Sequence, residues 1–445
     1  MSKLIYYNFR NTSLPFDTGD TTWIILAGGL VFLMIPALAL FEAGLLRKKN
    51  TVSVFMQIFF GLGFLSIMWF LFGFSLSFGP DQANGFIGNL HYGLFKNIPL
   101  NEPLDYAKTI PGISFAQFQM VVAVVTPLLL TGVIAERMKF SSFIIFIAAW
   151  SIFIYYPLVH WIWGGGWLAH LGVADFAGGI VIHTSAGMSA LAAALVLGRR
   201  RGFGPAIMVP HNIPIAVFGA ALLWLGWFGF NAGSALASGG LAANTITVTH
   251  MSSAAAALVW IGLSWKRTGK PSVVSGINGA LAGLVGITAI SGYVSIEYAV
   301  LIGIGIGFAS YAGLIIFKQK LRIDDALDVS SVHGISGIVG SLAIGIFAST
   351  MINPAGPNGA LFGNFSQFGS QLLGVGVAVI LGFGGTWIIL KVIKAIHGIR
   401  VSDKIEDIGL DVGEHAEEAY ADEEEYKIGD KEYQNQKKKE PESSE

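Results

Sequence analysis

The feature that most constrains this chain is a series of long stretches without any Asp, Glu, Lys or Arg. A helix that crosses the hydrocarbon core of a bilayer needs about 20 mostly apolar residues. Nine stretches reach that length, at 21–41, 50–80, 109–135, 140–174, 176–198, 202–265, 271–296, 298–317 and 329–390. Charged residues make up only 12% of the chain, against about 25% in soluble domains. We therefore expect an all-α polytopic membrane protein.

Two of these stretches, 202–265 and 329–390, are too long for one crossing. The first is interrupted by small and polar residues around 238–244, and the second by NPAGPNGALFGN at 353–364. Residues of these types favour turns. Dividing both stretches predicts eleven transmembrane helices.

The basic residues in the short loops predict the orientation, because Lys and Arg accumulate on the cytoplasmic side. Alternate loops hold Arg47, Lys48, Lys49, Arg137, Lys139, Arg199, Arg200, Arg201, Lys266, Arg267, Lys270, Lys318, Lys320 and Arg322. The opposite side holds only Lys3, Arg10, Lys96 and Lys108. We therefore expect the N-terminus outside and the C-terminus inside.

Charge also divides the chain into segments. The net charge of −1 combines +8 for residues 1–396 with −9 for residues 397–445. We expect an extracellular segment at 1–20, a transmembrane domain at 21–396, an ordered cytoplasmic tail at 397–420 and a disordered extension at 421–445. The simpler interpretation of the tail is a solvated acidic run.

Several classes of site are absent from the sequence. Without any Cys, the chain has no disulfide and no thiolate metal ligand. It has no GxxxxGK[ST] loop for ATP and no HExxH zinc pattern. We therefore expect no enzyme activity, metal, cofactor or nucleic-acid partner, although a metal-dependent membrane enzyme remains a competing interpretation.

Two histidines stand inside predicted spans. His183 and His333 are 150 residues apart, and each begins the pattern His-x-x-x-Gly. They fall in the fifth and tenth spans, which predicts an inverted repeat of five plus five helices, with one helix added, whose equivalent helices meet near the midplane. Two imidazoles that meet there can share a proton. The alternative is two separate histidines bonded to backbone carbonyls.

Aromatic and hydroxyl residues stand at the outer ends of the spans. Trp163 belongs to a Trp-rich segment, and Ser234 follows Phe230 at the end of the sixth span. An indole face attracts a desolvated cation by about 2 kcal/mol, and a hydroxyl accepts a hydrogen bond from an N–H group. The alternatives are an interfacial aromatic belt and ordinary helix packing. Acids near the spans are few, which suits a solute that crosses in a neutral form.

Several ordered motifs resemble those of the ammonium transporter (Amt/Mep/Rh) family. They are AERMKF at 135–140, WGGGWL at 163–168, DFAGGIVIHTSAG at 175–187, GWFGFNAGSA at 226–235 and DDALDVSSVHGISGIVG at 324–340. The likeness runs from about residue 21 to about residue 420, and it is greater to the prokaryotic Amt branch than to the Rh branch.

The resemblance implies a homotrimer in the cell (plasma or inner) membrane, with an eleven-helix ammonium pore in each subunit. It assigns His183 and His333 to the pore as twin histidines, and Trp163 and Ser234 to an outer recruitment site that Asp175 supports. Phe230 matches one ring of a phenylalanine gate. The other gate position falls on Val122 instead of Phe, so we expect the neighbouring Phe118 as a substitute.

The resemblance also concerns the tail. Gly398, Arg400, Gly409 and Asp411 match a cytoplasmic regulatory region, and a PII-type signalling protein binds the cytoplasmic face in that family. The function implied is ammonium recruitment, deprotonation and ammonia conduction. An ammonium sensor with little net transport is the alternative within the family.

Overall fold

The computed structural model describes residues 15–204 and 208–420, which form a helical bundle without any β-strand. The helices of the first half are α1 Thr18–Leu45, α2 Thr51–Met68, α3 Phe74–Phe78, α4 Gly112–Leu128, α5 Thr131–Ile134, α6 Phe140–Trp150, α7 Tyr156–Ile162, α8 Trp167–His170 and α9 Ser185–Leu197. Those of the second half are α10 Ile213–Gly233, α11 Gly240–Thr268, α12 Val273–Thr288, α13 Ile296–Leu314, α14 Ser336–Phe347, α15 Ser366–Ile380, α16 Thr386–Ile396, α17 Asp403–Ile408 and α18 Leu410–His415.

Shorter helical segments join or extend these helices. Six are π-helical: η2 Trp69–Gly73, η4 Ser151–Tyr155, η5 Gly179–Thr184, η6 Ile315–Lys320, η7 Ser330–Ile335 and η9 Leu381–Gly385. Three are 3₁₀-helical: η1 Lys48–Asn50, η3 Gly93–Phe95 and η8 Ala360–Phe362.

The predicted spans correspond to continuous helical segments. Ten segments of the described residues are long and apolar enough to cross a membrane: Thr18–Leu45, Lys48–Phe78, Gly112–Ile134, Phe140–His170, Gly179–Leu197, Ile213–Gly233, Gly240–Thr268, Ile296–Lys320, Ser330–Phe347 and Ser366–Ile396. The span expected at 271–296 corresponds to α12, an apolar helix of only 16 residues. The all-helical, multi-span prediction is therefore confirmed.

Element boundaries differ from the prediction where side chains cap the backbone. Helix α1 begins at Thr18, inside the segment expected to be extracellular, because the Asp17 carboxylate accepts the backbone N–H of Asp20 at 2.8 Å and starts the helix. The connection between α14 and α15 is longer than the predicted break, since Asn353 and Asn358 accept backbone N–H groups within its turns. The predictions for 1–14 and 421–445 lie outside the described residues.

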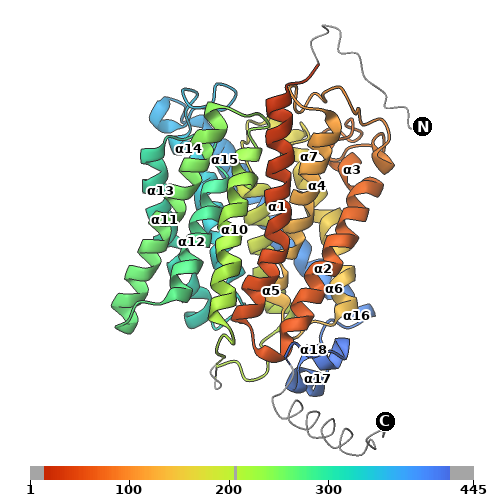
Figure 1. Cartoon of the computed structure of the whole chain (residues 1–445), viewed down its shortest axis with the longest axis vertical. Helices are drawn as coiled ribbons and strands as arrows, with labels where there is room; N and C mark the ends of the chain where they lie inside the picture. The colour runs from red at the N-terminus through yellow and green to blue at the C-terminus, as the bar shows by residue number, and fades with distance from the viewer. Residues whose placement is uncertain (1–14, 205–207, 421–445) are drawn as a thin grey trace, which may run out of the picture.

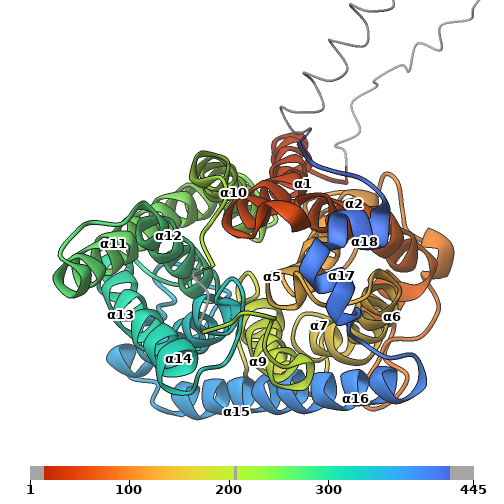
Figure 2. The same ribbon diagram turned by 90° about the horizontal axis from the view of Figure 1, so that it is seen from below.

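The bundle has two groups of helices. Figure 1 shows α1 running the height of the molecule, with α10 on one side of it and α2 and α4 on the other. Seen from below, α2, α6 and α7 occupy one side, α10 to α14 occupy the other, α5 and α9 lie between them, and α15 and α16 lie along one edge of both (Figure 2). Helices α17 and α18 lie under the first group only, and we call that end of the bundle the tail face.

Candidate functional site

A cavity of about 570 Å³ lies where α7 and α10 end and α11 begins. Its wall brings together five residues singled out from the sequence: Phe118, Val122, Trp163, Asp175 and Ser234. Further aromatic residues complete it, namely Phe78, Tyr106, Phe115, Phe176 and Tyr293. Sequence reasoning missed the tyrosines, which stand in loops and carry no motif. The cavity therefore combines aromatic faces with a few polar groups, as small-ligand sites commonly do.

Hydrogen bonds orient the polar groups of this cavity. The Trp163 indole donates from Nε1 to the Asp175 carbonyl at 2.7 Å. The Ser234 hydroxyl donates to the Phe230 carbonyl at 3.0 Å. Because that bond uses the only hydroxyl hydrogen, the Ser234 oxygen is left to act as an acceptor.

Asp175 supports the site through the backbone. Its carboxylate accepts the backbone N–H groups of Gly178, Gly179, Ile180 and Val181 at 2.7–3.0 Å. These groups stand at the beginning of η5, where a negative charge stabilises unpaired N–H donors. The side chain thus fixes the start of the segment that carries His183, while its carbonyl fixes Trp163.

The candidate gate residues are all buried, but they occupy different places. Val122 and Phe118 both line the cavity. The Phe118 ring packs closely against Gly233, where an added Cβ would lie 2.7 Å from Phe118 Cε2. Phe230 is not part of the cavity wall, and its ring lies 6.3 Å from the His183 ring, centroid to centroid.

The two histidines meet within the bundle. His183 Nδ1 and His333 Nδ1 are 3.2 Å apart. Because one nitrogen of such a contact donates and the other accepts, the neutral pair holds two different tautomers. The His183 ring also stacks on Trp227, with centroids 5.5 Å apart, and this contact was not predicted although Trp227 stands in the GWFGFNAGSA motif.

The glycines of the two His-x-x-x-Gly patterns let the helices approach. A Cβ on Gly187 would lie 2.1 Å from the Gly334 backbone, next to His333. A Cβ on Gly337 would lie 2.8 Å from the backbone nitrogen of Thr184, next to His183. Each glycine therefore opens the space that the other histidine segment occupies. Both histidines stand in π-helical turns, η5 and η7, a geometry that occurs often at functional sites.

The acid that caps the second histidine segment is not the one nearest to His333 in the sequence. Asp328, five residues before His333, forms an ion pair with Lys318 at 2.8 Å. Asp325 instead accepts the backbone N–H and hydroxyl of Ser330 at 2.7 Å each, at the beginning of η7. Asp325 precedes His333 by eight residues, as Asp175 precedes His183, so the two segments match more closely than predicted.

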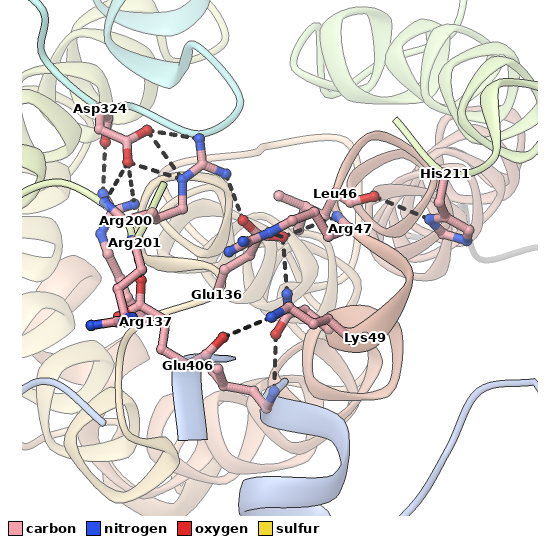
Figure 3. Close-up of polar contacts among 12 residues, drawn as sticks. Leu46, Arg47, Lys49, Glu136, Arg137, Arg200, Arg201, His211, Asp324 and Glu406 are labelled. Carbon is pink, nitrogen blue, oxygen red and sulfur yellow. Dashed lines mark hydrogen bonds and ion pairs between the residues drawn. The ribbon is translucent and has the colours of Figure 1, made fainter. Parts of the chain in front are cut away.

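A buried acid–base cluster lies at the tail face (Figure 3). The Glu136 carboxylate accepts hydrogen bonds from Arg47 at 3.0 Å, from Asn50 at 2.9 Å and from Arg200 at 2.7 Å. The other edge of the Arg200 guanidinium pairs with Asp324 at 2.7 Å. Burial alone would raise the pKa of Glu136, but the guanidinium groups hold it below its ordinary value. The sequence had marked these arginines only as orientation signals.

The tail packs onto this cluster. Arg400 pairs with Glu406 at 2.7 Å, and the same buried carboxylate accepts the backbone N–H of Arg201 at 2.6 Å. Gly398 offers its carbonyl to Ser142 at 2.6 Å. Gly409 has φ of 110° and lies against Lys49, whose carbonyl would be 2.4 Å from an added Cβ, so only glycine fits there.

Two tail carboxylates cap helices of the bundle. Asp411 accepts the backbone N–H of Ser53 at the start of α2, at 2.8 Å. Glu414 accepts the backbone N–H of Phe140 at the start of α6, at 3.0 Å. The four tail residues singled out from the sequence therefore belong to a segment that is docked on the bundle. Among the described residues, no group of three or more His, Asp or Glu side chains is arranged to hold a metal ion.

Comparisons with known proteins agree on one family. The model described as Ammonium Transporter Family matches residues 22–420. Ammonium transporter 1 of Dictyostelium discoideum is 51% identical over 93% of this chain and 90% of its own length. Ammonium transporter Amt1 of Archaeoglobus fulgidus is 43% identical over 90% of this chain and 99% of its own length.

Solved structures give the same answer for the fold. The crystal structure of Saccharomyces cerevisiae Mep2 superposes with a TM-score of 0.82 at 34% identity, covering 88% of this chain and 89% of that chain. A structure named Sensor Amt Protein superposes with a TM-score of 0.83 at 32% identity, covering 89% of this chain and 98% of that chain.

Proposed function

The chain belongs to the ammonium transporter family, as its motifs predicted, and from this premise we propose that it carries ammonium across a cell membrane. The observation that carries the proposal is the contact between His183 and His333, 3.2 Å apart, among buried apolar helices and close to an aromatic cavity. Relatives from archaea and bacteria are named ammonium transporters.

Recruitment is the first step of the proposed mechanism. Ammonium docks in the cavity against the Trp163 face and donates an N–H to the Ser234 oxygen. The cation–π attraction contributes about 2 kcal/mol where water is excluded. Potassium is also attracted by an aromatic face, but it has no hydrogen to donate to Ser234.

Deprotonation and conduction follow. An ion at the bilayer centre costs about 3 kcal/mol on insertion scales, so the solute loses its proton before it passes the buried ring of Phe230. Ammonia then moves past His183 and His333, while the proton moves along the imidazole pair. Potassium cannot be neutralised in this way and is rejected.

Topology and assembly complete the proposal. Eleven membrane helices, with α12 as the short one, leave the N-terminus outside and make the tail face cytoplasmic. The first five and the next five form an inverted repeat, which the reciprocal contacts of Gly187 and Gly337 support. Three copies assemble in the plasma or inner membrane, and the docked segment 397–420 regulates transport, with a PII-type protein as its partner.

The experiment is transport by the purified chain in liposomes. We expect an ammonium-evoked current that excess potassium does not reduce. Replacing both histidines, as His183→Ala with His333→Ala, should lower that current about tenfold or more, since positioned proton transfer contributes about 10²–10⁴-fold, or let potassium through. A normal, selective current in the double variant would contradict the proton path.

An ammonium sensor is the second candidate, favoured by the likeness to the structure named Sensor Amt Protein. A sensor would bind ammonium in the same cavity and carry little net current. Binding without current in the liposome experiment would therefore favour this alternative.

A further inference from the structure

Glu42 is a buried carboxylate that the proposed mechanism does not use. It lies near the end of α1 and is only 2% exposed. Its Oε2 atom is buried and has no hydrogen-bond partner within the described residues. Such a group is unfavourable in an apolar environment unless it binds a proton or a water molecule. Its presence therefore points to a ligand of one of these two kinds.

The same carboxylate lines a small cavity together with His333. The cavity measures about 20 Å³, and Asn278 is its third polar residue. The other seven lining residues are apolar, so Glu42 and His333 are the only titratable groups in its wall. A cavity needs about 10–15 Å³ of this measure to hold one water, and the water needs at least two polar partners. Both requirements are met.

The packing around Glu42 preserves this space. Gly132, in α5, faces the carboxylate, and an added Cβ there would lie 3.1 Å from Glu42 Oε1 and 2.9 Å from Val329. The larger aromatic cavity lined by Trp163 includes neither Glu42 nor His333. The two cavities thus share no lining residue, and Glu42 stands three residues before the end of α1, which leads to Arg47 and the cluster at the tail face.

We propose that Glu42 is the proton acceptor beyond the histidine pair, reached from His333 through one water molecule. This rests on the proposed function, because it assigns the next step of the proton's path. The N–H bond of protonated His333 breaks as an O–H forms on the water, and an O–H of that water breaks as one forms on Glu42. Glu42 then releases the proton to water or ammonia at the tail face, which restores the carboxylate.

The test uses the full chain in liposomes and two readouts, the ammonium-evoked current and the entry of ammonia measured as internal alkalinisation above that of empty liposomes. Glu42→Gln keeps the shape and removes the titratable group. We expect it to lower the current at least tenfold while ammonia entry stays within twofold of the original chain. Glu42→Asp should restore a measurable part of the current, with a changed pH profile.

The matched control is Glu297→Gln, which makes the same change at an exposed carboxylate in the first turn of α13. Glu297 lines neither cavity, so we expect the original current. A Glu42→Gln current equal to that of the original chain between pH 5 and 8 would overturn the proposal. So would the loss of both readouts in Glu42→Gln and Glu42→Asp, which would mean that Glu42 serves folding. Absence of current in the original chain would instead count against the proposed function.

Discussion

Gly187 and Gly334 touch backbone to backbone where the two histidine segments cross, so closely that a methyl group on Gly187 would lie 2.1 Å from Gly334 Cα. Gly334 directly follows His333, and Gly187 stands one turn after His183. The distance between the imidazoles is therefore set by two residues without side chains. Close approach of this kind is a recognised use of small residues in membrane helices.

The first prediction concerns Gly187→Ala. The added methyl group must push η7 away from α9, and overpacking of this kind costs about 1–3 kcal/mol. We expect a lower melting temperature in detergent and a several-fold loss of ammonium current, because the histidine contact of 3.2 Å lengthens. The control is Gly63→Ala in α2, where nothing lies within 4 Å of the added Cβ. Equal melting temperatures and currents in the two variants would show that the crossing tolerates a side chain.

The spans and the histidine pair could be predicted from the sequence for physical reasons. Charged side chains are so costly in a bilayer that their absence over 20 residues marks a helix. His183 precedes Gly187, and His333 precedes Gly337, by the same four residues. This repeated spacing indicates two equivalent helical segments that can approach each other closely. Trp163 and Ser234 stood out by residue type and position, the family resemblance added the gate residues, and the structure brings most of them to one cavity wall.

The acid–base cluster could not be predicted in this way. Glu136 and Arg200 are 64 residues apart, and Arg200 and Asp324 are 124 apart. In the sequence, each of these three residues is a charged residue in a loop. A single sequence does not indicate which loop charges form pairs or become buried. Asp325 was missed for a related reason, since the sequence does not indicate which of Asp324, Asp325 and Asp328 caps the start of η7.

The second prediction concerns Val122→Phe. Val122 lines the aromatic cavity beside Phe118, and the cavity of about 570 Å³ has room for a ring. An added aromatic face attracts ammonium by about 0.5–2 kcal/mol, which corresponds to about 2–30-fold in apparent affinity. We expect half-saturation of the current at lower ammonium concentration and a lower maximal rate through the narrowed path. Val122→Leu adds bulk without a π face and should leave half-saturation unchanged; the same shift in both variants would assign the effect to size.

The third prediction concerns the stability contributed by Glu136. Removing one partner of a buried ion pair costs about 3–5 kcal/mol, so Glu136→Gln should lower the melting temperature clearly at pH 7. The matched variant Asp407→Asn removes an exposed partner of Arg201 and should change it little, since surface pairs contribute about 0–1 kcal/mol.

The difference in melting temperature between the original chain and Glu136→Gln should depend on pH. The reason is that the pKa of Glu136 is lowered from its ordinary value of 4.5. A carboxyl group with a lower pKa in the folded state contributes stability above the unfolded pKa and loses it as pH falls through the folded pKa. The gap in melting temperature between the original chain and Glu136→Gln should thus be constant above about pH 5 and close below pH 4.5. A gap that widens on acidification would contradict this sign.

The last prediction concerns the docking of the tail. Asp411 and Glu414 accept backbone N–H groups at the starts of α2 and α6, and a charge at a helix N-terminus contributes about 0.3–1 kcal/mol. Replacing both by Ala should release α17 and α18 and speed trypsin cleavage after the exposed Lys404 by several-fold. Glu418→Ala removes an exposed carboxylate of the same tail, 14 residues after Lys404, and should leave cleavage unchanged. If the tail regulates transport, the double variant and a chain ending before Gly398 should change the ammonium current in the same direction. Faster cleavage with an unaltered current and an unaltered response to a PII-type protein would mean that the docked tail only protects the tail face.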